Sequence, residues 1–172
     1  MDHMSPALSV LGEENAAAPR KLPVRVCIFT VGDSQYTVDL RHVREVFPIE
    51  SITPMPGMPP VIIGMTNVRG SVVPIVDLRL LLGLPQTKLI PLFAVVLWHE
   101  EFQLAVLVDC SPEIMAVLPE QFGPVPNNSL ENSEARRFSV NDGVTIDEVF
   151  IPLLKVTEFV AYLESEASIE SV

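Results

Sequence analysis

The stretch GMTNVRGSVVPIVDLR runs from Gly64 to Arg79. Near its middle, Arg69 stands between Val68 and Gly70, with apolar residues on either side. A charged side chain rarely enters a fold without a partner. Asn67 favours a turn, and the two glycines permit positive φ or close backbone approach. The stretch therefore predicts two short strands, joined at a tight corner that lifts Arg69 out of the sheet.

Residue type alone leaves two roles open for Arg69. It can close an internal ion pair, for which Asp39, Glu45 and Asp77 are the candidate carboxylates. It can equally make a contact with another molecule, because arginine is enriched at the hot spots of protein interfaces.

Further strands are predicted on both sides of the corner, at 24–31 and 36–40 around the turn Gly32–Gln35, and at 92–98 and 102–109 around His99–Glu101. Asp77 can cap a short helix over 78–82. A longer helix is predicted over 153–164, where Leu153, Val156, Val160 and Leu163, with Phe159 between them, follow the spacing of one helical face. The chain is therefore mainly β, with one sound helix near its end.

The chain also repeats itself. YTVD, ending at Asp39, has a counterpart in VLVD, ending at Asp109, and the segment ending at Pro74 resembles the one ending at Pro152. We infer two similar small β-barrels packed together, the first at about 23–88 and the second at about 89–153. Residues 1–22 are expected to form a disordered extension and residues 165–172 a loose tail.

Charge and composition exclude several classes of function. The net charge is −11, and residues 87–172 hold 14 acidic but only 4 basic residues. This balance argues against binding to nucleic acid or to anionic lipid surfaces. Four prolines interrupt the longest uncharged stretch, 51–68, so we expect no insertion into a membrane. Cys27 and Cys110 are expected to be buried free thiols, and no histidine cluster predicts a metal site.

No catalytic residues or cofactors are predicted. Asp39, Asp77 and Asp109 each end an apolar strand, where a carboxylate more often caps a turn than does acid–base chemistry. None of them belongs to a recognisable catalytic motif with histidine, serine or lysine. The glycines at 64 and 70 lack the lysine and helix of a phosphate-binding loop. A small carboxylate-dependent hydrolase thus remains only a remote alternative.

The stretch GMTNVRGSVVPIVDLR resembles the hallmark of the CheW family, the coupling proteins of bacterial chemosensory arrays, and the resemblance extends upstream through IFTVGDSQYTVDLRHVREV. Residues 24–84 fit closely and residues 90–163 more loosely, so a CheW-like domain is expected at 23–164. The resemblance implies two five-stranded SH3-like barrels and a C-terminal helix. It also implies a non-enzymatic adaptor in the cytoplasm, peripheral to membrane-bound receptor arrays. Its partners would be the regulatory domain of a CheA-type histidine kinase and the cytoplasmic tips of methyl-accepting chemoreceptors.

The resemblance also assigns residues. Val43, Glu45, Gly64 and Arg69 take positions tied to receptor or kinase coupling, Asn67 and Gly70 shape the corner, and Asp77 and Arg79 support the first barrel. Lys155 departs from the family, which often has an aspartate after the last strand. Two alternatives stay open: a generic SH3-like peptide-binding module, and an orphan coupler that titrates arrays without coupling a kinase.

Overall fold

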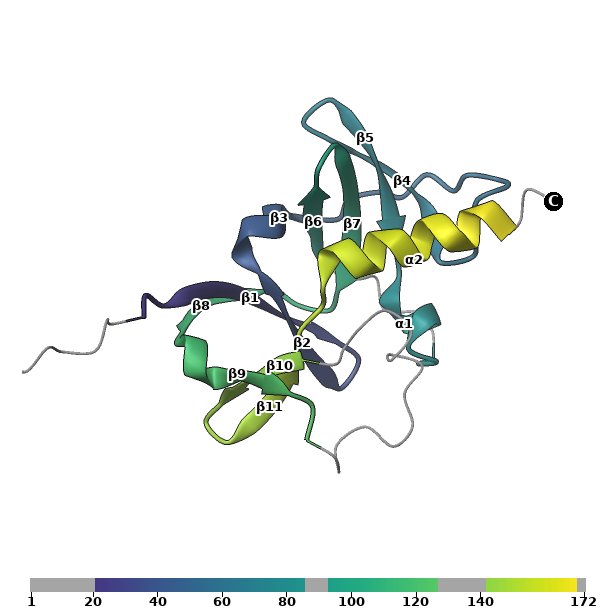
Figure 1. Cartoon of the computed structure of the whole chain (residues 1–172). Coiled ribbons are helices and arrows are strands. Elements are labelled where there is room, and N and C mark those ends of the chain that lie inside the picture. Colours follow the sequence, from purple (N-terminus) through teal and green to yellow (C-terminus); the bar gives the residue numbers. More distant parts are fainter. Residues whose placement is uncertain (1–20, 86–92, 127–141, 170–172) are drawn as a thin grey trace, which may run out of the picture.

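The computed structural model describes residues 21–85, 93–126 and 142–169 (Figure 1). Its elements in chain order are β1 (Val24–Val31), β2 (Ser34–Asp39), the 3-10 turn η1 (Leu40–His42), β3 (Val43–Pro48), β4 (Ile62–Val68), β5 (Ser71–Val76), α1 (Leu78–Leu81), β6 (Phe93–His99), β7 (Phe102–Val108), β8 (Glu113–Val117), η2 (Pro119–Gln121), β9 (Phe122–Pro124), β10 (Asp142–Ile146), β11 (Val149–Pro152) and α2 (Val156–Ile169). The predicted hairpins and the short helix capped by Asp77 are all present.

Two barrel-like units make up the fold. The five-stranded barrel is one sheet in the order β3-β6-β7-β5-β4, in which only β5 and β7 run parallel. The second unit, here called the split barrel, consists of the sheets β2-β1-β8 and β11-β10-β9. A parallel bridge between Thr37 and Leu153 joins these two sheets, and the Leu154 N–H donates to the Thr37 carbonyl at 2.8 Å. The mainly β class with a C-terminal helix is confirmed.

The chain is divided between the barrels differently from the predicted split near residue 88. The five-stranded barrel takes β3 to β7, while the split barrel combines β1 and β2 with β8 to β11. The first hairpin of each half therefore joins strands of the other half. The β1–β2 hairpin joins β8 to β11, and the β6–β7 hairpin joins β3 to β5. The reason is physical: the halves are similar, so a hairpin can bury the same apolar face against either set of strands, and local sequence does not choose between them.

The internal repeat is still visible in the strand order of the two units. The order β8-β1-β2-β11-β10 matches β3-β6-β7-β5-β4 strand for strand once the Thr37–Leu153 bridge is included. Val76 lies opposite Ile62 and Pro152 opposite Gly143, so Pro152 corresponds to Val76 rather than to Pro74 as predicted.

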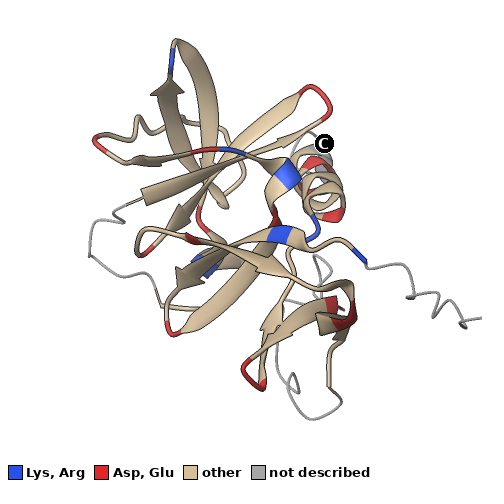
Figure 2. Cartoon of the chain, turned by 90° about the vertical axis from the view of Figure 1, so that its left-hand side faces the viewer, with Lys and Arg blue, Asp and Glu red and all other residues tan. Residues whose placement is uncertain are grey.

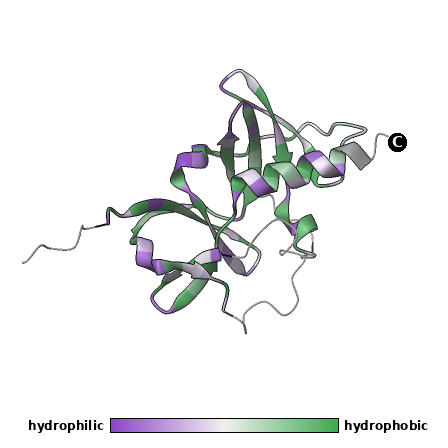
Figure 3. Cartoon of the chain, viewed as in Figure 1, coloured by the Kyte–Doolittle hydropathy of each residue, from purple (hydrophilic) through white to green (hydrophobic). Residues whose placement is uncertain are grey.

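The largest apolar cluster lies where the two barrels and α2 meet. It combines Phe29 of β1, Leu97 of β6 and Leu104 of β7 with the buried face of α2, which includes Phe159 and Val160. Figure 3 shows hydrophobic segments along these inner strands. Truncation of a buried aromatic such as Phe159 typically costs about 3–5 kcal/mol. Helix α2 therefore helps to hold the two barrels together as well as covering their junction.

The predicted helical face is buried, but the helix bounds differ from the prediction. The helix begins at Val156 because Leu153 and Leu154 are still tied to the split barrel. It continues to Ile169, so the expected loose tail is helical up to that residue. Nothing in 164–169 breaks a helix, since this segment contains neither proline nor glycine. The predicted extension at 1–22 lies outside the described residues except for Lys21 and Leu22.

Acidic residues lie mainly at turns, at strand ends and on α2 (Figure 2). Cys27 is buried, but Cys110 is exposed, which corrects the prediction of two buried thiols. Cys110 follows the last residues of an apolar strand and already belongs to a surface loop.

Among the described helices, none is long and apolar enough to cross a membrane. Within the same residues, no group of three or more histidine, cysteine, aspartate or glutamate side chains is placed to hold a metal ion.

Candidate interaction site at the β4–β5 corner

The predicted corner is a two-residue hairpin turn between β4 and β5. Arg69 has φ 49° and Gly70 φ 86°, as the tight turns that match strand twist require at both central positions. The Asn67 side chain accepts a hydrogen bond from the Gly70 N–H at 2.8 Å. Asn67 and Gly70 therefore both take part in the turn. Arg69 adopts positive φ without being glycine, which is a local backbone cost.

Arg69 is paired and still faces solvent. Its Nε donates to Oε1 of Glu45 at 2.8 Å, so Glu45 is the partner among the three candidate carboxylates. The side chain of Arg69 is 82% exposed, whereas that of Glu45 is 21% exposed. The pair positions the guanidinium but leaves most of its donors free for another molecule.

A groove of about 400 Å³ adjoins this pair. Its walls come from the two edge strands of the five-stranded barrel, β3 and β4, and from the segment after β3; its lining includes Phe47, Pro48, Glu50, Thr66 and Val68. Val46 and Val72, which belong to β3 and β5, are among the exposed large apolar residues of the same barrel. An exposed arginine beside apolar surface is a common arrangement at interaction hot spots.

Gly64 lies inside the barrel rather than on its surface. A Cβ there would lie 2.5 Å from the Thr53 carbonyl oxygen and 2.7 Å from a methyl of Ile52. The same loop is paired with β4, because Thr53 and Met65 exchange backbone hydrogen bonds of 2.8 and 2.9 Å. Gly64 therefore allows the proline-rich segment to pack tightly on β4. Any effect of Gly64 on partner binding would therefore act through the position of this loop.

Val43 is half-buried and packs against the main core, opposite Leu97 of β6. The register of β3 on β6 shifts between Val43 and Glu45, which marks a bulge at Arg44. A bulge of this kind re-aims the side chains that follow it. The structure thus brings Glu45, Asn67, Arg69 and Gly70 together at one corner. Val43, two residues before Glu45 on β3, packs instead against the main core.

Asp77 and Arg79 form a largely buried ion pair at the start of α1. Asp77 Oδ1 accepts from the Arg79 N–H at 3.0 Å and caps α1. The Arg79 guanidinium, 4% exposed, pairs with Asp77 and with Asp109. The second oxygen of Asp109 accepts from the Gly32 N–H at 2.6 Å, so the cluster ties the five-stranded barrel to the β1–β2 turn of the split barrel. Its support thus extends to both units, beyond the first barrel alone.

The sequence did not indicate the partner of Arg79. Asp109 was recognised only as an aspartate that ends a strand. The offset repeat of VLVD against YTVD is the one signal that singles it out.

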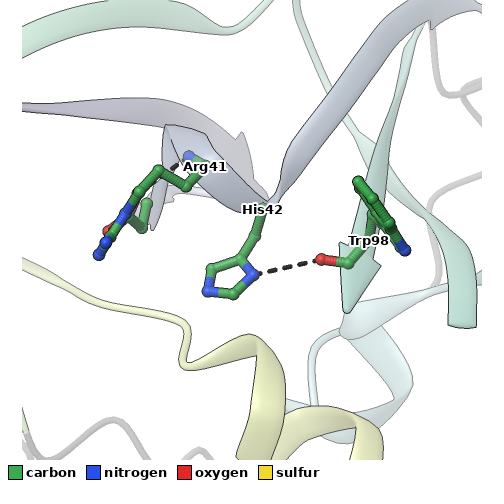
Figure 4. Close-up of polar contacts among 4 residues, drawn as sticks. Arg41, His42 and Trp98 are labelled. Atoms are coloured by element: carbon green, nitrogen blue, oxygen red, sulfur yellow. Dashed lines mark hydrogen bonds and ion pairs between the residues drawn. The ribbon is translucent and has the colours of Figure 1, made fainter. Parts of the chain in front are cut away.

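A second surface feature lies around η1 and the end of β6 (Figure 4). His42 Nδ1 is 3.2 Å from the carbonyl oxygen of Trp98, and the guanidinium carbon of Arg44 lies 5.8 Å from the centre of the Trp98 ring. Arg41 donates to both oxygens of Asp39, and these hydrogen bonds lower the pKa of Asp39 from its ordinary value. The sequence singled out none of these residues as functional; it pointed only to Asp39, as a cap or as a candidate ion-pair partner of Arg69.

Comparison with known proteins agrees with this architecture. Residues 25–164 match the family model of the CheW-like domain, and the chain therefore belongs to the CheW family. It is 30% identical over 141 residues to a probable chemotaxis protein CheW of Rhizobium etli, covering 81% of this chain and 89% of that protein. It is 31% identical over 130 residues to the chemotaxis protein CheW of Rhizobium meliloti, covering 71% and 84%.

A solved structure shows the same fold. The scaffolding protein CheW of Thermoanaerobacter tengcongensis superposes with a TM-score of 0.68 at 23% identity, covering 78% of this chain and 90% of that one.

Proposed function

We propose that this chain is a non-enzymatic adaptor that links chemoreceptors to a CheA-type histidine kinase. Within that role, it binds the regulatory domain of the kinase and the cytoplasmic tip of the receptors. It acts in the cytoplasm, at the periphery of membrane-bound arrays. Membership of a family whose named members are chemotaxis and scaffolding proteins supports this role.

The observation that carries the proposal is the exposed Arg69 held by Glu45. A guanidinium that served only the fold would be expected to lie buried between internal carboxylates, as that of Arg79 does. Arg69 instead projects from a rigid corner beside a groove and apolar surface. Held in place before binding, it loses less conformational freedom on association, which favours affinity.

The direct test is assembly from purified components. The full chain is mixed with a kinase regulatory domain and a soluble receptor-tip fragment, and complexes are separated by size-exclusion chromatography. We expect binary complexes with each partner and a ternary complex with both. Arg69→Ala should weaken at least one binary complex, while Asp147→Asn, at an exposed turn of the split barrel, should bind like the natural chain. Failure to bind either partner would refute the adaptor role.

The two alternatives predict different results in the same experiment. An orphan coupler binds receptor tips but no kinase domain. A generic SH3-like module binds neither and instead takes a proline-rich peptide. Aromatic side chains normally line grooves that hold such peptides. Phe47 is the only aromatic residue that lines the groove beside Arg69 among the described residues, so this alternative has less support.

A further inference from the structure

The internal repeat pairs residues whose side chains have diverged. The Asp77 N–H donates to the Val61 carbonyl at 3.2 Å, and the Leu153 N–H donates to the Asp142 carbonyl at 2.9 Å, in equivalent places of the two barrels. Asp77 thus corresponds to Leu153. Two residues further along, Arg79 corresponds to Lys155.

In the five-stranded barrel, a side chain fills the space beyond the ends of the parallel strands β5 and β7. Arg79 follows β5 and reaches Asp109, the residue that follows β7. Its guanidinium is buried there between two carboxylates, those of Asp77 and Asp109. This fold therefore binds an arginine side chain at that location.

In the other barrel the corresponding space is open. Lys155 follows β11, and Asp39, the counterpart of Asp109, ends β2. The ammonium of Lys155 pairs with other carboxylates than that of Asp39: it lies 2.7 Å from Asp142 and 3.7 Å from Glu158. Between Asp39 and the segment 153–158 lies a pocket of about 290 Å³, which His42 also lines.

The chemistry of this pocket favours a cation. Asp39 and Glu158 present carboxylates to it, and Lys155 is already engaged by two acidic side chains. The present partner of Asp39 is Arg41, whose side chain is 84% exposed and therefore easily displaced or shared. Arg41 already donates to both oxygens of Asp39, so an incoming guanidinium would have to displace this exposed side chain. Planar guanidinium groups match carboxylates in two-point hydrogen bonding better than ammonium groups do.

We propose that the pocket between Asp39 and Glu158 is a binding site for an arginine side chain presented by a partner protein, in the manner of Arg79 at Asp109. The bound guanidinium would pair with Asp39 and Glu158. The proposal goes beyond receptor and kinase coupling and does not depend on it, because the site lies at the start of α2, away from the Arg69 corner.

The test uses the full, isotope-labelled chain and three small probes, so it is independent of any array component. N-acetyl-arginine-N-methylamide is titrated against the protein, with the citrulline analogue as a neutral isostere and the lysine analogue as a different cation. The readouts are the NMR shifts of the His42 imidazole and of the backbone amides of residues 153–158. We expect saturable shifts with the arginine probe at these positions. Affinity for the citrulline and lysine probes should be weaker by about tenfold, as expected for the loss of one charge-assisted hydrogen bond.

Three variants sharpen the result. Asp39→Asn removes the charge at the surface with little change of shape and should weaken arginine binding about tenfold. Lys155→Arg should place its own guanidinium in the pocket and abolish the response. Asp147→Asn, outside the pocket lining, should bind like the natural chain. The proposal is overturned if the citrulline or lysine probe binds as well as arginine, if the shifts do not saturate, or if Asp39→Asn and Lys155→Arg leave the titration unchanged.

Discussion

Arg69 and Glu45 join the two edges of one sheet. Glu45 belongs to β3 and Arg69 follows β4, and these strands are first and last in the order β3-β6-β7-β5-β4. Their 2.8 Å ion pair therefore bridges the seam at which the five-stranded barrel closes. Since the arginine is mostly in solvent, the pair contributes little stability of its own and mainly orients the guanidinium.

This distinction leads to the first prediction. Arg69→Ala should change the free energy of unfolding by about 0.5 kcal/mol or less, because the pair is exposed. Binding to receptor or kinase should weaken by roughly 2 kcal/mol, some thirtyfold. Urea unfolding and a quantitative pull-down measure the two quantities. A large fall in the unfolding midpoint with binding intact would make Arg69 a structural residue instead.

Arg79 should behave in the opposite way. Arg79→Ala leaves Asp77 and Asp109 without their buried cation and should cost roughly 3–5 kcal/mol of stability. Arg41→Ala breaks an exposed pair with Asp39 and serves as the matched control, with little change in stability expected. Thermal and urea denaturation of both variants test this difference. Equal small effects would mean that the buried cluster does not tie the barrels together.

Gly64 should be intolerant of any side chain. Gly64→Ala places a methyl group against the Thr53 backbone and should cost about 1–3 kcal/mol. Gly123→Ala is the control, because no heavy atom lies within 4 Å of the added Cβ and no positive φ opposes it. Hydrogen exchange should show faster opening at the Thr53 and Met65 amides in Gly64→Ala only. Unchanged protection there would contradict the packing role assigned to this glycine.

The β10–β11 turn offers a stabilising change. Asp147 and Glu148 have φ of 47° and 65°, a left-handed conformation that costs a non-glycine residue about 1–2 kcal/mol. Glu148→Gly should therefore raise the melting temperature, with a gain of up to about 1 kcal/mol after the added entropy of the unfolded glycine. Glu148→Ala keeps the backbone cost and should give no such gain. A melting temperature of Glu148→Gly at or below that of Glu148→Ala would argue against this strain.

Cys27 makes stability depend on alkaline pH. Burial raises its pKa from 9.0 to about 11, so the thiol stays protonated in the folded chain after the unfolded chain has begun to ionise. This contribution to stability is present in full below pH 9 and is lost progressively between about pH 9 and 11. The urea midpoint should fall more steeply over this window in the natural chain than in Cys27→Val, which cannot ionise. Parallel pH profiles would show that Cys27 is not the group responsible.

The sequence by itself determined the local structure and the family. Alternation and turn residues placed the hairpins, helical spacing identified the buried face around Phe159, and Asp77 marked the start of α1. The Asn67–Gly70 pattern set the geometry of the corner on which Arg69 stands. These features depend on interactions within a few residues, so the order of side chains is enough to predict them.

Tertiary structure decided which hairpin joins which barrel and which charges meet. The two halves are similar, so only long-range packing assigns the β1–β2 hairpin to the strands β8 to β11. The same packing brings Arg79 to Asp109 and pairs Lys155 with Asp142. Pairings of this kind join residues far apart in the chain, and the sum of burial and electrostatic terms over the whole fold selects them. Local sequence contains no information about that sum.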